Sequence, residues 1–242
     1  MSDHIVSSFD DEMEGLRTEL VRMGSLVIDQ INSVVKALKM RDLQQANRVR
    51  MNDKQVDAIN DDIEERVMAI LALRHPFAVD LRETIAALKV ARELERIGDL
   101  AKNTAMRTGV IIEGDKVKGA KKVVKMGKQV AANVETVMSA YENRDIDQAL
   151  EVWFGDEEID NYCNQVFETV LTGMMTDNSN INACTQLTFV AKNFERMGDH
   201  ATRIASATHY VVTAESIREK RPKLDRTSST RYLLEEDDED EG

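Results

Sequence analysis

The sequence has 242 residues, a formal net charge of −12 and an isoelectric point near 4.9, which argues against a nucleic-acid partner because neutralising phosphates requires a basic face. Its longest apolar run, residues 67–73, is far below the roughly 20 residues that span a membrane, and its acidic N-terminus does not resemble a signal peptide. Cys163 and Cys184 are too few for a disulfide framework or a zinc site, so we expect a cytoplasmic protein with reduced thiols.

Composition favours long amphipathic helices. Hydrophobic residues make up 42% of the chain and aromatic residues only 5%, so the core must be aliphatic. The only prolines are Pro76 and Pro222, and 31% of the residues are charged, a profile into which β-structure is hard to fit. We therefore predict an all-α fold.

Hydrophobic periodicity predicts three helices in the first half. The first spans about residues 4–40, and the second opens at Asp42, which begins a capping sequence. Pro76 ends the second helix and is expected in the first turn of the third, which should fray near Gly109 before a linker at residues 113–119. The expected core positions of the second and third helices are Val49, Val56, Ile59, Ile63, Val67, Ile70, Ala87, Val90, Leu94, Ile97 and Ala101.

The same plan then repeats. A fourth helix is expected at residues 121–143, Asp145 opens a fifth as Asp42 opens the second, and residues 177–179 form the turn into a sixth. The offset between the halves is 103 residues at the second helix and 100 at the third, which indicates an internal duplication of a three-helix unit. The expected core positions of the sixth helix are Leu187, Val190, Phe194, Met197, Ala201 and Ile204.

A heptapeptide recurs at matching positions of the third and sixth helices, at residues 95–101 and 195–201. Each copy places a glutamate and an aspartate four residues apart, which puts both carboxylates on one face of a helix. A single pair of this kind usually belongs to a solvated face. Its repetition in both halves favours a functional role.

The duplication contains a second set of acid pairs, Asp53 with Asp57 and Asp156 with Asp160, on the second and fifth helices. Each pair flanks its apolar seam, so we expect it to face the heptapeptide acids of the neighbouring antiparallel helix. Four carboxylates gathered in this way repel one another unless cations lie between them. The hypothesis is therefore one metal site in each half.

Clusters with only oxygen ligands suit hard ions such as Mg²⁺, Ca²⁺ and Mn²⁺, and oxidised iron. None of the four histidines lies three residues after a glutamate, which argues against a di-iron oxidase bundle. His200 is expected to be a surface or interhelical residue. The sequence contains no nucleophile–base pair and no glycine-rich phosphate loop, so we do not expect an enzyme.

Three segments resemble the PhoU family: Pro76–Arg82, Leu94–Asp99 and Ala191–Thr202, and the similarity extends over residues 5–216. The resemblance implies tandem three-helix bundles whose E/D-x-x-x-D motifs bind metal clusters. In this chain those motifs are Asp53/Asp57, Glu95/Asp99, Asp156/Asp160 and Glu195/Asp199. The metal stays open among Mg, Mn, Ca, Fe and Zn.

The family resemblance also implies a negative regulator of phosphate uptake and of the phosphate-starvation response. Its expected partners are the ATPase subunit of a phosphate ABC transporter, a sensor histidine kinase and a second copy in a homodimer, and it would reach the membrane only through partners. The alternative is a carboxylate metal-binding or storage bundle without a signalling role.

We accordingly divide the chain into a first PhoU repeat at residues 1–113, a second at 114–220 and a disordered acidic tail at 221–242. The tail lies outside the family pattern and ends in an unbroken acidic run, Glu235–Glu241. Gly98 and Gly198 are expected to permit close approach of the helices or to leave room beside the acids. Arg96 and Arg196 are expected to pair with acids of neighbouring helices.

Overall fold

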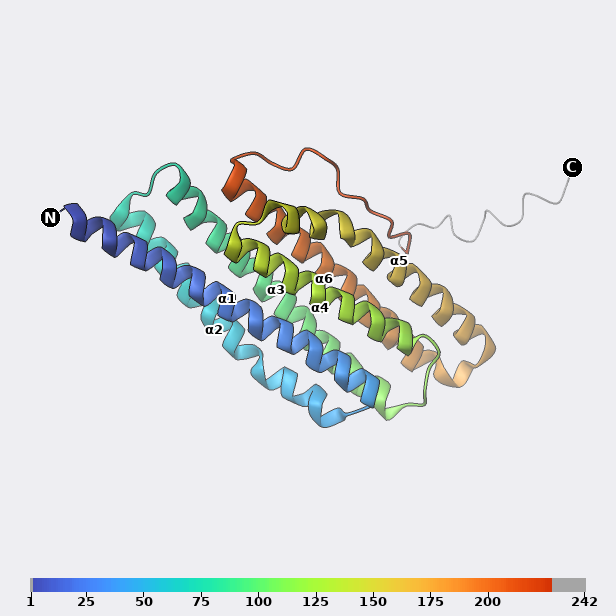
Figure 1. The fold of residues 1–242 in the computed structure, drawn as a ribbon. Coiled ribbons are helices and arrows are strands. Elements are labelled where there is room, and N and C mark those ends of the chain that lie inside the picture. Colours follow the sequence, from blue (N-terminus) through green and yellow to red (C-terminus); the bar gives the residue numbers. More distant parts are fainter. Residues whose placement is uncertain (1, 228–242) are drawn as a thin grey trace, which may run out of the picture.

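The computed structural model describes residues 2–227, with residues 2–8, 52 and 178 described by their backbone only. This part of the chain is helical and contains no strand (Figure 1). The elements are α1 Ser2–Met40, α2 Leu43–Arg74, α3 Val79–Glu113, α4 Ala120–Asn143, α5 Ile146–Thr176, the short 3₁₀ turn η1 Asn178–Asn180, and α6 Ile181–Thr213.

The two halves begin their second helices in the same way. The side chain of Asp42 accepts a hydrogen bond from the backbone N–H of Gln45 at 3.0 Å, and Asp145 accepts one from Gln148 at 3.0 Å. These are N-caps that satisfy donors at the helix start. Both predicted caps, and with them the duplicated plan, are confirmed.

Two expected boundaries were wrong. α3 passes through Gly109 to Glu113, because Ile111 is buried in the core and Arg41 donates to the Ile112 carbonyl at 2.6 Å. Pro76 lies in the connection before α3 and not in its first turn, because the preceding residue, His75, adopts a left-handed conformation with φ 49°. A tertiary contact therefore accompanies the later end of α3, and a local backbone conformation separates Pro76 from its start.

The two three-helix bundles share one core. α1 contacts α4, α3 contacts α6, and α1–α3 and α4–α6 also pack within their halves, while α2 and α5 lie on opposite flanks (Figure 1). Every core position expected from the seams of the second, third and sixth helices is buried. Within residues 2–227, none of the helices has an apolar stretch sufficient to cross a membrane.

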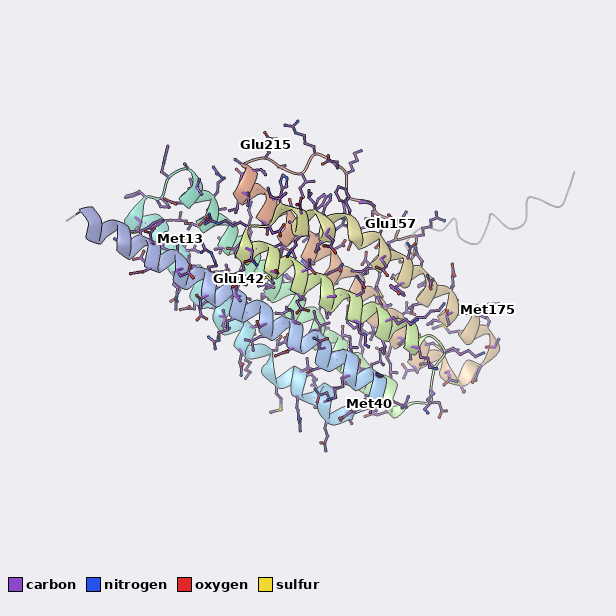
Figure 2. All side chains as sticks on the ribbon, viewed as in Figure 1. Met13, Met40, Glu142, Glu157, Met175 and Glu215 are labelled. Carbon is purple, nitrogen blue, oxygen red and sulfur yellow. The ribbon has the colours of Figure 1, made fainter. Side chains whose placement is uncertain are left out.

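Several large apolar side chains at the ends of the helices are exposed. Met40 and Met175, at the ends of α1 and α5, are 66% and 87% exposed (Figure 2). Leu73 and Phe77, at the α2–α3 connection, are 77% and 85% exposed. Others lie within the helices, among them Met51 and Phe154, which are 77% and 40% exposed next to the acid pairs of α2 and α5.

Residues 214–227, which we call the C-terminal strap, leave α6 and run along α5 on the outside of the bundle (Figure 1). The prediction of a disordered tail from residue 221 was wrong for residues 221–227, because their polar groups bond to α5 and α6. Residues 228–242, with the acidic run Glu235–Glu241, lie outside the described residues.

Candidate cation sites in two acidic clusters

Each half gathers four carboxylates where two antiparallel helices meet. The first cluster consists of Asp53 and Asp57 from α2 and Glu95 and Asp99 from α3. The second cluster consists of Asp156 and Asp160 from α5 and Glu195 and Asp199 from α6. The buried seams on either side of these acids hold each helix pair together, so the acids must share the space between them.

A glycine in the heptapeptide makes room for each cluster. A Cβ atom on Gly198 would lie 2.8 Å from Asp156 Oδ1 and 2.9 Å from Ile159 Cδ1. A Cβ atom on Gly98 would lie 3.3 Å from Val56 Cγ1 and 3.8 Å from Asp53 Oδ1. Of the two roles expected for these glycines, the distances support close approach of the helices, and the contact is tighter in the second half.

In the first cluster a lysine from α3 lies between the two helices. Lys102 Nζ donates to Asp53 Oδ2 and, at 3.0 Å, to Asp99 Oδ1. These two bonds raise the pKa of Lys102 above its ordinary value. The lysine therefore stays charged and neutralises part of the cluster.

The other two acids of the first cluster are held less firmly. Asp57 is exposed and Glu95 is half-buried. Burial, followed by repulsion from Asp53, raises the pKa of Asp57. Burial also raises the pKa of Glu95, with Asp99 and Asp57 adding to the effect against the neighbouring Arg96. The positive charges near Asp57 and Glu95 therefore do not fully offset the burial and repulsion that these two carboxylates experience.

The second cluster is more deeply buried. Asp156, Asp160 and Glu195 are only 1%, 1% and 3% exposed. Neither carboxylate oxygen of Asp156 accepts a hydrogen bond from any described residue. Burial raises the pKa of Asp156 to about 7, against the lowering effect of Arg221 and with help from the other three acids. A buried carboxylate without a hydrogen-bond donor is costly to ionise, which agrees with this raised pKa.

The cation nearest to the second cluster comes from the strap. Arg221 Nη2 lies 2.5 Å from Asp199 Oδ1, and Arg221 Nε lies 3.6 Å from Asp156 Oδ2. Arg221 also donates to Thr202 Oγ1 at 2.6 Å. Thr202 occupies the position that corresponds to Lys102 at the offset of 100 residues. Arg221 therefore supplies from the strap the charge that Lys102 supplies from α3.

The strap backbone also binds the second cluster. The N–H groups of Leu224 and Asp225 donate to Asp160 Oδ2 at 2.7 and 3.0 Å. Asn164 donates to the Leu224 carbonyl at 2.8 Å and accepts from the N–H of Arg226 at 3.1 Å. These four bonds attach the strap to α5 next to the cluster.

The remaining acid, Glu195, pairs with a lysine that the strap also contacts. Lys192 Nζ lies 3.3 Å from Glu195 Oε2 and 2.6 Å from Asp225 Oδ2. Burial alone would lower the pKa of Lys192, but Asp225 and Glu195 raise it overall. Burial raises the pKa of Glu195 and outweighs the lysine. Every acid of the second cluster is thus contacted by the strap or by a residue that the strap holds.

Both sets of four predicted acids are neighbours, but their side chains are arranged around lysine and arginine. Among residues 2–227, no group of three or more Asp, Glu, His or Cys side chains is set as a metal would require. Sequence reasoning missed Lys102, Lys192 and Arg221. The sequence could have revealed Lys102, because it follows Asp99 by three residues on the same helix, a spacing that allows an ion pair. Arg221 was missed because it was assigned to the disordered tail.

The heptapeptide arginines were placed wrongly. Arg96 lies 3.4 Å from Glu95 and 4.0 Å from Asp99 of its own helix, and Arg196 is exposed, because both point outward from the face that meets α2 or α5. His200 is interhelical, as expected. Its Nδ1 atom lies 2.5 Å from Glu93 Oε2, joining α6 to α3.

The PhoU domain matches this chain twice, at residues 20–108 and 123–208. A phosphate-specific transport system accessory protein PhoU homolog of Caulobacter vibrioides is 42% identical over 93% of this chain and 98% of its own length. One from Xylella fastidiosa is 38% identical over 93% of this chain and 94% of its own. The crystal structure of PhoU from Pseudomonas aeruginosa superposes with a TM-score of 0.83 and 35% identity, covering 86% of this chain and all of that one.

Proposed function

Since this chain belongs to the PhoU family, we propose that it is a negative regulator of phosphate uptake and of the phosphate-starvation response. In this role it is an adaptor, without catalytic activity, between the ATPase subunit of a phosphate ABC transporter and a sensor histidine kinase. It works in the cytoplasm, forms a homodimer and reaches the membrane only through those proteins.

The observation that carries this proposal is the extent of the similarity. The relatives named as accessory proteins of phosphate-specific transport match nearly all of this chain, including both clusters and the helices between them. A shared fold alone would leave the function open. A match over nearly the whole length of both chains supports a shared role in phosphate transport.

We further propose that both acidic clusters bind hard metal ions. The donor set fits, because all eight predicted ligands are carboxylates. Asp156 is buried with two oxygens that accept no hydrogen bond from the described residues. The residues that would hold metal are Asp53, Asp57, Glu95 and Asp99 in the first half and Asp156, Asp160, Glu195 and Asp199 in the second. A bound ion would supply positive charge that fixes α2 against α3 and α5 against α6.

The alternative of a metal-storage bundle has less support. A storage site needs open carboxylates, whereas Lys102 and Arg221 already contact acids of both clusters. A pulldown from phosphate-replete cells separates the two functions. The adaptor should recover the transporter ATPase or the sensor kinase, and a storage protein should recover neither while holding many ions per chain.

Deleting the gene tests the regulatory role. In a deletion strain grown with abundant phosphate, a reporter of phosphate-starvation genes should be switched on, and the wild-type gene should restore repression. Repression that persists without the gene would refute the regulatory role.

A further inference from the structure

The strap holds the second cluster in a way that has no counterpart in the first. Arg221 contacts Asp156 and Asp199, two strap N–H groups share one oxygen of Asp160, and Asp225 holds the lysine that faces Glu195. Lys223 adds a further positive charge 3.6 Å from Asp199 Oδ2. The strap thus acts on all four carboxylates, directly or through Lys192.

A divalent cation would need the same oxygen atoms. The Asp199 oxygens face Arg221 and Lys223, and Asp160 Oδ2 already accepts two hydrogen bonds. Two positively charged side chains beside the cluster would repel a third cation at close range. The second cluster therefore cannot take a metal ion with the strap in this position.

The first cluster has a smaller obstacle. Among the described residues, Lys102 of α3 pairs with Asp53 and Asp99 only, so the rotation of one flexible side chain would free the cluster. The second cluster can be freed only by moving a backbone segment. The two halves of the protein therefore differ in the step that must precede metal binding: a side-chain rotation in the first and a backbone movement in the second.

The first part of the strap, residues 214–220, is suited to movement. Residues 214–216 and 218–220 are exposed, and the strap borders a groove of about 770 Å³ that also contains Trp153, Tyr210 and Arg82. The indole N–H of Trp153 donates to the Glu219 carbonyl at 3.3 Å. Little apolar surface holds residues 214–220, so the contacts at the second cluster fix the position of the strap.

We propose that the C-terminal strap and a divalent cation are mutually exclusive occupants of the second acidic cluster, so that metal binding in the second half releases the strap from α5 and α6. This inference rests on the metal-binding part of the proposed function. It makes the second half a metal-sensitive switch that changes the outer surface of α5 and α6, whereas the first half binds metal without releasing a segment.

The only tryptophan of the chain reports the state of the strap. We would titrate the full-length protein with Mn²⁺, measuring bound metal by electron paramagnetic resonance and strap release by the emission and acrylamide quenching of Trp153. The variant E95Q/D99N removes two ligands of the first cluster, so its remaining Mn²⁺ binding reports the second. In this variant Mn²⁺ should shift the emission to longer wavelength and increase quenching in proportion to the metal bound.

Arg221→Gln weakens the strap without touching a predicted ligand. If the strap is docked about nine-tenths of the time, this variant should bind Mn²⁺ at the second cluster about tenfold more tightly, because apparent affinity scales with the fraction of open molecules. Without metal it should already show nearly all of the Trp153 change, because a tenfold gain means that the strap is almost always released. The matched control is Lys220→Gln, which removes the same charge from an exposed strap residue, and it should behave as wild type.

Two results would overturn the proposal in distinguishable ways. If Mn²⁺ binds the second cluster with no change at Trp153, and Arg221→Gln binds no more tightly than Lys220→Gln, the strap does not compete and metal binding itself stands. If neither E95Q/D99N nor Arg221→Gln binds Mn²⁺ at the second cluster while circular dichroism shows both folded, the metal site fails and the switch fails with it.

Discussion

Oδ1 of Asp156 lies only 2.8 Å from the position that a Cβ atom on Gly198 would occupy. α5 and α6 can approach at the second cluster because residue 198 has no side chain. A methyl group at position 198 should therefore disturb both the packing of α5 against α6 and the position of the buried Asp156 carboxylate.

Gly198→Ala should therefore destabilise the protein despite removing a helical glycine. The better helix propensity of alanine contributes about 1 kcal/mol, while overpacking against Asp156 and Ile159 costs about 1–3 kcal/mol. Urea denaturation should show a net loss. The matched control is Gly155→Ala on α5, where a Cβ atom would meet nothing within 4 Å and stability should rise. Equal effects of the two variants would contradict this reading of the contact.

The pH dependence of stability should reflect Asp156. Its pKa is about 7 in the folded protein against an ordinary 3.8, so between these values the folded state binds more protons than the unfolded state. Stability then falls as pH rises, by about 2 kcal/mol between pH 5.5 and 8. Urea unfolding in the presence of a chelator measures this slope. Asp156→Asn should flatten it and be the more stable variant at pH 8, and an unchanged slope would show that Asp156 is ionised throughout.

The pair formed by His200 and Glu93 should couple the two halves of the molecule. Their 2.5 Å contact joins α6 to α3 and is largely buried. A double-mutant cycle with His200→Ala and Glu93→Gln should give a coupling of about 0.5–3 kcal/mol. The control cycle pairs Glu93→Gln with Arg203→Gln, because Arg203 lies 3.6 Å from the same glutamate and is 60% exposed, so its coupling should be smaller. If the coupling energy between Glu93 and Arg203 were the larger of the two, Arg203 and not His200 would carry the contact between the halves.

Two truncations should separate the strap from the residues beyond it. A chain that ends at Asp225 keeps the contacts of Arg221 and Leu224 and should melt close to the wild type. A chain that ends at Glu219 loses them, which should lower the melting temperature by roughly 3–10 °C, at 2–4 °C per kcal/mol for a protein of this size. Equal melting temperatures would show that the strap contacts add no stability.

The helices and core could be predicted because their causes are local or periodic. Asp42 and Asp145 are N-caps that mark the starts of two helices, and the apolar residues of the seams through Leu94 and Phe194 repeat at helical spacing. The extension of α3 past Gly109 was missed, since it is accompanied by the burial of Ile111 in the core and the hydrogen bond from Arg41 to the Ile112 carbonyl. Local propensity gives no information on such contacts.

The candidate site could be predicted only in part: its acids could be found from the sequence, and the arginine that pairs with the second cluster could not. The eight acids could be found because the duplication shows each pair twice. The cation of the second cluster could not, because Thr202 replaces the lysine of the first half and Arg221 comes from a segment with no apolar pattern. Its place is set by hydrogen bonds to Asp160 and Asn164, which leave no periodic trace in a sequence.

The central claim is that the duplicated acids bind metal ions, and counting bound ions tests it most directly. Equilibrium dialysis against Mn²⁺ would compare wild type with E95Q/D99N, E195Q/D199N and the variant that combines all four changes. We predict that wild type binds in both halves, that each double variant loses the binding of its own half, and that the combined variant binds none while circular dichroism shows it folded. Equal Mn²⁺ content in the combined variant and the wild type would contradict the account and leave these carboxylates as partners of Lys102, Lys192 and Arg221 alone.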